Sequence, residues 1–152
     1  MTSNKSELAV AALRNGTVID HIPSDALFKA VRILDLEHMD RAITIGFNLD
    51  SKKLGKKSII KVSDVEFDEA TLNRIAIIAP SAVVNTIRDN EVAEKQQVTL
   101  PETITGIVRC PNPKCITNNE PMETKFHVES MNPVVCRCHY CNTEVKGEEA
   151  QV

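Results

Sequence analysis

The segment "TVIDHIPSDALFKAVRILDL", residues 17–36, changes its hydrophobic period part-way along. Its first six residues are β-branched or alternate in polarity, which is typical of a strand, and Pro23 ends that pattern. Further on, apolar side chains recur at helical spacing, at positions 27, 28, 31 and 34. Ser24 is a candidate N-cap for this stretch. The segment therefore predicts a strand at 17–22 followed by an amphipathic helix at 24–36.

The patterns that follow continue the alternation of strands and helices. A strand, a lysine-rich turn, a strand, a helix and a last strand are predicted in that order, at residues 42–49, 50–57, 58–62, 67–79 and 82–87. Asp68 is a candidate N-cap of the second helix, and Pro80 ends it. The order β-α-β-β-α-β is that of the ferredoxin-like double unit, which places two helices on one face of an antiparallel sheet. Residues 7–13 and 90–95 are candidates for extra edge strands.

Cysteines are distributed unevenly along the chain. All five fall within 110–141, after a polar stretch at 94–106. We predict a domain break near 98–102, with domains at 1–99 and 100–152. The second domain shows short strand patterns divided by Asn and Pro turns, at residues 104–110, 122–130 and 132–138. The expected fold class is therefore α+β, with a ferredoxin-like N-terminal domain and a small all-β C-terminal domain that binds zinc.

Four of the cysteines form two closely spaced pairs. Four residues separate Cys110 from Cys115, and two separate Cys138 from Cys141. Two such turns facing each other supply four sulfur ligands in a tetrahedron, the geometry of structural zinc. A domain of about fifty residues with few apolar side chains needs such a cross-link to be stable. Because protein ligands fill every position, we expect one structural Zn²⁺ per chain and no catalytic metal.

Cys136 is the remaining cysteine, and it could also pair with Cys141 at a four-residue spacing. We favour Cys138, because two-residue knuckles direct backbone N–H groups at the sulfurs. Cys136 would then face a small core from a strand. His127 and His139 are candidate ligands by residue type alone, and ordinary surface or strand histidines are the simpler interpretation.

Bulk properties disfavour several classes of protein. The net charge is −3, and residues 101–152 carry five Lys or Arg against seven Asp or Glu, so a zinc-containing nucleic-acid binder is disfavoured. No run of about 18 apolar residues predicts a membrane helix, and the first residues lack the apolar segment of a secretion signal. We expect a cytoplasmic protein with no nucleic-acid or membrane partner. Cytosolic thiols stay reduced, which favours metal ligation over disulfides.

A cluster of lysines surrounds the predicted turn between the two middle strands. Its members are Lys52, Lys53, Lys56, Lys57 and Lys61. A solvated hairpin tip is the simpler interpretation, and a phosphate site is the alternative. Lys57 and Lys61 are evenly spaced in a strand and therefore point to the same side, and Lys95 could join them across the sheet. Neither a Walker motif nor GxGxxG is present, so nucleotide hydrolysis is not implied.

Asp20 and His21 are adjacent polar residues inside the first predicted strand. Strand alternation predicts that they point to opposite faces. An edge strand with one wet face is the simpler interpretation, and a ribose hydroxyl or base amino group bound by Asp20 is the alternative. No nucleophile elbow accompanies them, which argues against a Ser/His/Asp triad. A hydrolase would need metal-binding carboxylates beside the lysines, and the acidic run at 64–69 fits a helix start better.

Taken together, these segments resemble a known family over nearly the full length of the chain. The similarity is to the regulatory chain of aspartate carbamoyltransferase, the bacterial allosteric enzyme of pyrimidine synthesis. The motifs that carry it are "RNGTVIDHIP" (14–23), "ITIGFNL" (43–49), "GKKSIIKV" (55–62), "IAPSAVVNTI" (78–87), "LPETI" (100–104) and the set "CPNPKC…CHYC". Each of these motifs is weak evidence alone, except the cysteine set. In combination they are specific.

The resemblance implies a non-catalytic subunit of two domains. The N-terminal allosteric domain would bind CTP as inhibitor and ATP as activator, with UTP assisting CTP. The C-terminal zinc domain would dock on the catalytic chain. Homodimers of regulatory chains would bridge catalytic trimers, in a dodecamer of two catalytic trimers and three regulatory dimers.

Carried over residue by residue, the resemblance also implies an effector site. The expected site residues are Val10, Ala11, Ala12, Leu13, Val18, Asp20, His21, Lys57, Lys61, Asn85, Ile87, Asn90, Val92 and Lys95. The segment 10–13 would meet the base, Asp20 the ribose, and His21 and Lys95 the phosphates. Lys61 would lie near the ribose and base, which Asn85, Ile87, Asn90 and Val92 would line. The implied metal ligands are Cys110, Cys115, Cys138 and Cys141.

Four residues depart from the family pattern. Ala11 stands where the family often has an acid, and Asn90 where an aromatic is found. These two predict altered responses to ATP and CTP. Lys114 replaces an Asn of the docking loop and Asn142 replaces an acid, which predicts a changed contact with the catalytic chain.

Overall fold

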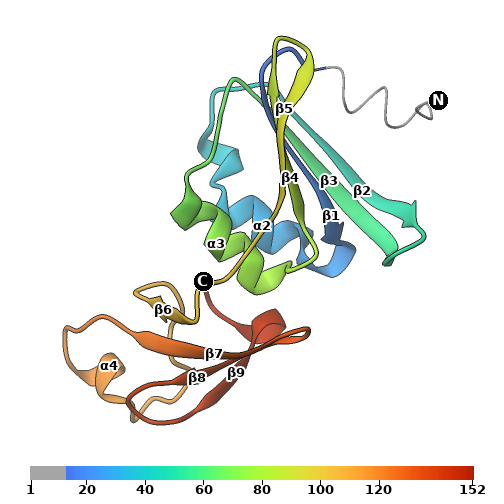
Figure 1. Ribbon diagram of the computed structural model, residues 1–152. Coiled ribbons are helices and arrows are strands. Elements are labelled where there is room, and N and C mark those ends of the chain that lie inside the picture. The colour runs from blue at the N-terminus through green and yellow to red at the C-terminus, as the bar shows by residue number, and fades with distance from the viewer. Residues whose placement is uncertain (1–12) are drawn as a thin grey trace.

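The computed structural model describes residues 13–152, which form two antiparallel sheets (Figure 1). The candidate strand at 7–13 lies almost wholly outside the described residues. The expected site residues Val10, Ala11 and Ala12 also lie outside the described residues. No described helix has the length and apolar character needed to cross a membrane.

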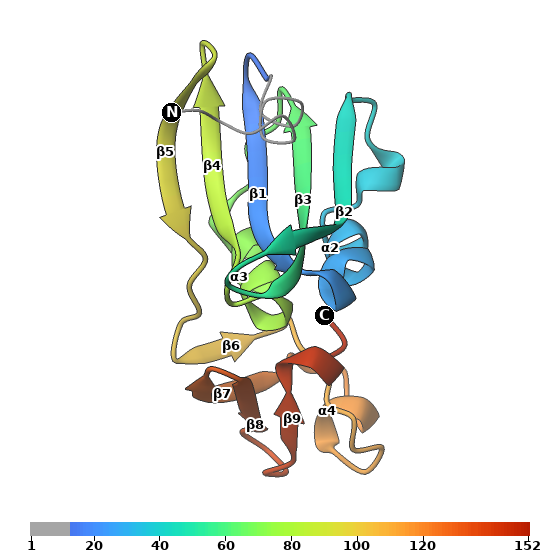
Figure 2. The same ribbon diagram turned by 90° about the vertical axis from the view of Figure 1, so that its right-hand side faces the viewer.

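The first sheet has five strands. They are β1 (Gly16–Pro23), β2 (Ile43–Ser51), β3 (Gly55–Ser63), β4 (Val83–Arg88) and β5 (Glu91–Gln97). Their spatial order is β2-β3-β1-β4-β5, and every neighbouring pair is antiparallel. Helices α2 (Leu27–Ile33) and α3 (Glu69–Ile78) pack together against one face of this sheet (Figures 1 and 2). This arrangement confirms the predicted ferredoxin-like domain, with β5 as the added edge strand.

The core lies between the sheet and the two helices. Ile19, Ile60 and Val84 point from neighbouring strands into the cluster that includes Ile75 of α3. Full burial of such a side chain stabilises the fold by about 1.5–3 kcal/mol. The strand period of two sends the intervening residues, such as Val18 and Lys61, to the opposite face.

The structure confirms the start of one predicted helix and corrects the other. Asp68 caps α3, since its Oδ1 accepts a hydrogen bond from the Thr71 amide at 2.8 Å. Hydrogen bonding by the Thr71 side chain, together with its amide, lowers the pKa of Asp68. Ser24 does not cap a helix. It begins a 3₁₀ turn, Ser24–Ala26, whose capping position is Pro23, and the capping position of α2 is Ala26.

The predicted helix at 24–36 is also shorter than expected. The α-helical part ends at Ile33, and the chain then enters a left-handed conformation at Asp35, with φ of 56°. A second 3₁₀ turn follows at Leu36–His38. Buried Leu34 and Leu36 continue the apolar contact with the core across this break.

The second sheet has four short strands. They are β6 (Thr103–Thr105), β7 (Lys125–Met131), β8 (Val134–Cys138) and β9 (Glu144–Lys146), in the order β6-β7-β8-β9. A short helix α4 (Ile116–Asn119) lies between β6 and β7, and a 3₁₀ turn, Gly147–Glu149, follows β9. Strand patterns at 122–130 and 132–138 were predicted, whereas β9 was not. Only the start of 104–110 is a strand.

The two sheets pack against each other through the end of α3. Gly147 lies so close to this helix that a Cβ there would sit 2.3 Å from the Ile77 carbonyl oxygen and 2.8 Å from Val134 Cβ. Lys29 Nζ of α2 donates a hydrogen bond to the carbonyl of Glu148. Buried residues of both sheets therefore belong to one continuous apolar cluster.

Replacing Gly147 by alanine should destabilise this interface by about 1–3 kcal/mol, because the added methyl has no space. Urea denaturation of the purified chain would measure the loss. Lys146→Ala, at the exposed neighbouring position, is the matched control. Equal midpoints for parent, Gly147→Ala and Lys146→Ala would contradict the close approach.

Candidate functional site

Four cysteine sulfurs meet at one end of the second sheet. Cys110 Sγ lies 3.5 Å from Cys141 Sγ, and Cys115 Sγ lies 3.8 Å from Cys138 Sγ. All four sulfurs lie within 4.8 Å of one another. Three of the four residues are buried, and Cys141 is half-buried. The set is therefore compact enough for one metal ion.

Local turns hold the two cysteine pairs in place. Asn118 Nδ2 of α4 donates to the carbonyls of Cys110 and Asn112, at 2.9 and 2.7 Å, which fixes the first loop. In the second loop the Asn142 amide donates to the Cys138 carbonyl at 3.0 Å. Asn142 itself has a φ of 63°, a conformation that asparagine tolerates well. Both loops thus turn back sharply and present their sulfurs to each other.

The protein alone does not favour ionisation of all four thiols. Burial raises the pKa of Cys110 to about 12, and burial also raises the pKa of Cys138. Burial opposes ionisation of Cys141 as well, but contacts with Thr143 bring its pKa down to about 6. Four thiolates at this spacing would repel one another, so a bound cation is needed to keep them deprotonated. The donor set fits a metal ion held by sulfur.

Cys136 and the two histidines lie outside this cluster. Cys136 is buried in the core of the second sheet, opposite Val128 and Val145, as predicted. Burial raises the pKa of its thiol. His127 Nε2 and His139 Nδ1 instead face each other at 2.9 Å on the surface. The simpler interpretation of both histidines is therefore confirmed.

The other candidate site lies on the face of the five-stranded sheet away from α2 and α3 (Figure 2). Strand register places four expected residues there in one row. Lys61 pairs with Val18, Val18 with Asn85, and Asn85 with Lys95. Directly paired residues share a face. The row therefore brings together side chains from β3, β1, β4 and β5.

Asp20 and His21 lie beside this row at a bulge in β1. The register of β1 against β3 shifts between Ile19 and Ile22, and His21 has a φ of 60°. Asp20 Oδ1 lies 3.0 Å from Lys57 Nζ and accepts a hydrogen bond from the His21 amide at 2.6 Å. His21 Nδ1 lies 3.4 Å from Asp20 Oδ2. The prediction that the two side chains point to opposite faces is wrong, because the bulge breaks the alternation.

An apolar patch adjoins the polar row. Leu13, Val18, Ile59 and Ile87 form a small buried cluster of their own, with Leu49 packed against it. Ile59 was not predicted as a site residue. The same even spacing that paired Lys57 with Lys61 places Ile59 between them, so the signal was present. Val92, opposite Ile87, is exposed.

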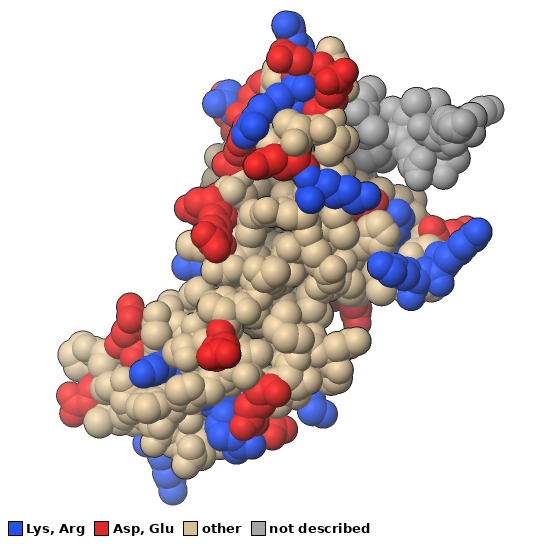
Figure 3. All heavy atoms as spheres, viewed as in Figure 1, with Lys and Arg blue, Asp and Glu red and all other residues tan. Residues whose placement is uncertain are grey.

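The remaining expected residues lie at the edges of this face. Asn90 occupies the β4–β5 turn, where its amide donates to the Arg14 carbonyl at 2.9 Å. Lys52, Lys53 and Lys56 lie on the exposed end of the β2–β3 hairpin, and Lys56 pairs there with Asp50 at 2.6 Å. These three lysines therefore lie at an exposed hairpin end, as the simpler interpretation expects. Figure 3 shows acidic and basic side chains mixed at that end of the molecule.

Comparison with known proteins matches both parts of the chain. Residues 8–99 match the model of the allosteric domain of the aspartate carbamoyltransferase regulatory chain, and residues 102–151 match that of its metal binding domain. The chain belongs to the aspartate carbamoyltransferase regulatory chain family. Regulatory chains of Bacteroides fragilis and Bacteroides thetaiotaomicron are each 57% identical to it, over 100% of this chain and 99% of theirs. That of Pyrococcus abyssi is 47% identical over 95% of this chain and 96% of its own.

The family membership assigns each site to one domain. The row on the open sheet face lies within the residues matched by the allosteric domain, and the cysteine cluster lies within the metal binding domain. Because the relatives are regulatory chains, the protein is a non-catalytic subunit of aspartate carbamoyltransferase. The recognition made from the sequence motifs is confirmed.

Removing one ligand should release the metal and unfold the second sheet. Cys138→Ala leaves three sulfurs, and we expect metal content to fall from about one ion per chain to near zero. Cys136→Ala is the matched control, since it truncates a buried cysteine on the same strand and should retain the ion. Elemental analysis and circular dichroism of both variants would decide. Metal loss in Cys136→Ala with retention in Cys138→Ala would contradict the assignment.

Proposed function

We propose that the open face of the five-stranded sheet is an effector site for nucleoside triphosphates. CTP acts there as inhibitor and ATP as activator, competing for one site, and UTP assists CTP. The row formed by Lys61, Val18, Asn85 and Lys95 carries this proposal. It joins cationic, amide and apolar groups on a sheet face that the described helices leave uncovered.

The chemistry of these groups suits the parts of a nucleotide. The ammonium group of Lys95 would attract phosphate oxygens, and the His21 ring would contact the phosphate region as well. The Asp20 carboxylate, already oriented by Lys57, accepts hydrogen bonds from ribose hydroxyls. Val18 and Ile87 offer apolar contact for the base, while the Asn85 amide supplies both a donor and an acceptor. Asn90 and Val92 extend the wall on the base side.

We further propose that the metal is zinc, bound once per chain by Cys110, Cys115, Cys138 and Cys141. Four-cysteine sites of tetrahedral shape are typical of structural zinc. The bound ion would stabilise the turns that carry the cysteines. These residues would leave no position for substrate, so zinc would act on folding and docking alone.

The partner of the metal domain would be the catalytic chain of the same enzyme. Ile116 follows Cys115 and Tyr140 precedes Cys141, and both side chains are exposed large apolar groups. One such residue on each cysteine loop forms a surface that depends on the metal for its shape. The assembly would be a dodecamer of two catalytic trimers bridged by three regulatory dimers, in the cytoplasm.

The regulatory dimer would form along the β2 edge of the sheet. Among the described strands, β2 pairs only with β3, which leaves its other edge open. Beside that edge the Phe28 and Phe47 rings meet at 5.5 Å while remaining 60% and 48% exposed. Two copies of one antiparallel edge can pair about a two-fold axis, each supplying the same surface. A second copy of this chain would therefore cover both the open edge and the phenylalanines.

Regulation follows if the chain binds nucleotide unequally in two states of the enzyme. A ligand with equal affinity for both states would shift nothing. Couplings of this kind typically amount to about 1–3 kcal/mol, and they are reciprocal. An active-site ligand on the catalytic chain should then change the affinity of the regulatory chain for CTP.

Calorimetric titration of the metal-loaded chain tests the effector site. CTP should bind saturably, and ATP should compete with it. Lys95→Ala should weaken CTP binding about tenfold or more, because a charge-assisted contact is lost. Lys114→Ala, an exposed lysine of the metal domain, should leave it unchanged. Absence of CTP binding to the parent chain would show that Ala11 and Asn90 have removed the site.

Sedimentation of the isolated chain tests the dimer surface. Phe47→Asp should convert the dimer to a monomer at micromolar concentration, because a charge would be buried between the copies. Val92→Asp places the same charge on an exposed apolar residue of the opposite edge strand, β5, and should leave the dimer intact. Dissociation by Val92→Asp alone would place the interface at the wrong edge.

A further inference from the structure

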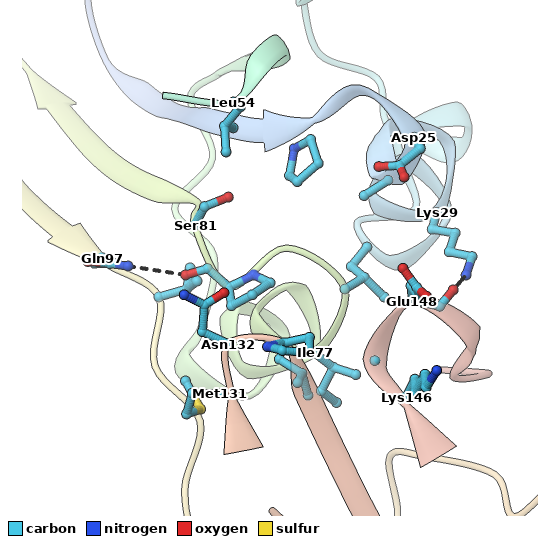
Figure 4. A pocket seen from close by; sticks show the side chains of 18 residues that line it. Asp25, Lys29, Leu54, Ile77, Ser81, Gln97, Met131, Asn132, Lys146 and Glu148 are labelled. Atoms are coloured by element: carbon cyan, nitrogen blue, oxygen red, sulfur yellow. Dashed lines mark hydrogen bonds between the residues drawn. The ribbon is translucent and has the colours of Figure 1, made fainter. Parts of the chain in front are cut away.

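A groove of about 780 Å³ lies between the two sheets, and its walls come from both domains. Ser81 lies on the side of the first sheet, and Met131 and Asn132 lie on the side of the second (Figure 4). Pro80 also lines the groove. Glu148, which accepts the hydrogen bond from Lys29, lies at the other end. Any shift of the first domain against the second must change the shape of this groove.

Ser81 connects the groove to the proposed effector site. Its Oγ donates a hydrogen bond of 2.8 Å to the carbonyl of His21. His21 is the bulged residue of β1 with positive φ, and its amide is bound to the Asp20 carboxylate. The same peptide segment is therefore bound on one side by an effector-site residue and on the other by a groove residue.

A second contact connects the Ser81 loop to the chain segment between the domains. Gln97 Nε2 donates to the Pro80 carbonyl at 3.2 Å, and the Val98 amide donates to the Ala82 carbonyl at 3.1 Å. Gln97 is the last residue of β5, so the chain leaves the first domain at this point. The loop at 80–82 thus contacts both the bulge of β1 and the start of the interdomain connection.

The bulge is a suitable place for a two-state response. A non-glycine residue at positive φ is held there by its surroundings rather than by its own preference. In His21 those surroundings are the Asp20 carboxylate, which the nucleotide would engage, and the Ser81 hydroxyl. A ligand that draws Asp20 away from the His21 amide changes one of the two hydrogen bonds that hold the backbone of His21.

We propose that Ser81 is a positioning residue that couples the effector site to the domain interface. The proposal rests on the effector site described above and adds the route by which occupancy is passed on. Nucleotide contact with Asp20 and His21 would move the His21 carbonyl, the Ser81 hydroxyl would follow it, and the loop at 80–82 would shift relative to residues 131–134 across the groove. Ser81 itself would make no contact with the nucleotide.

Removing the Ser81 hydroxyl should separate binding from response. In the complete enzyme with its own catalytic chain, Ser81→Ala should bind CTP within about twofold of the parent affinity. The change in aspartate half-saturation that CTP produces should fall by a factor of about two to ten, which is what one hydrogen bond contributes to an equilibrium. Ser81→Thr retains a hydroxyl and should restore the response.

Thr17→Val is the matched control. Thr17 lies on β1, the strand that carries His21, and its hydroxyl also donates a hydrogen bond to a backbone carbonyl, that of Val65. It should leave the CTP response unchanged. Parent-like coupling in Ser81→Ala would overturn this inference and leave the effector site standing. Loss of CTP affinity in Ser81→Ala would also overturn it, since Ser81 would then belong to the binding site. A parent enzyme that neither binds nor responds to CTP would overturn both proposals.

Discussion

The convergence of four cysteine sulfurs is the constraint on which the C-terminal domain depends. Its strands are three to seven residues long, and few large apolar side chains besides Phe126 are fully buried there. Burial alone gives so small a sheet little stability. The cysteines close two loops that are distant in sequence, and the surface residues Ile116 and Tyr140 lie on those loops. Metal binding and the proposed docking surface therefore depend on the same two loops.

The N-terminal domain divides its two tasks between the two faces of a sheet. One face is buried against α2 and α3 and supplies stability through aliphatic side chains such as Ile19 and Ile75. The other carries lysines, Asp20 and Asn85 around a small apolar patch. Because strand alternation fixes which residue belongs to which face, the effector face can vary in sequence without changing the core. Irregularities of pairing interrupt this rule in β1, between Ile19 and Ile22, and also where β2 pairs with β3 and β4 with β5.

Sequence patterns were sufficient to predict secondary structure where apolar side chains recur with a regular period. Alternating and helical patterns predicted the strand order and both helices, and Asp68 was recognised as a cap because its side chain acts locally. Cysteine spacing favoured the four residues whose sulfurs the structure brings together. The bulge at His21 could not be predicted, because non-local contacts with Lys57 and Ser81 hold it. Strand β9 was missed for a similar reason: three residues carry too little pattern to be distinguished from a loop.

The position of the cysteines along the chain also bears on biosynthesis. The ligand set is complete only with Cys141, after the entire five-stranded domain has been made, and domains generally fold in order of synthesis. A newly made chain can therefore carry a folded allosteric domain while its metal binding domain still awaits metal. Under the function proposed above, such a chain could bind nucleotide but could not join the enzyme. Supply of metal to the cell would then limit how many catalytic chains acquire a regulatory partner.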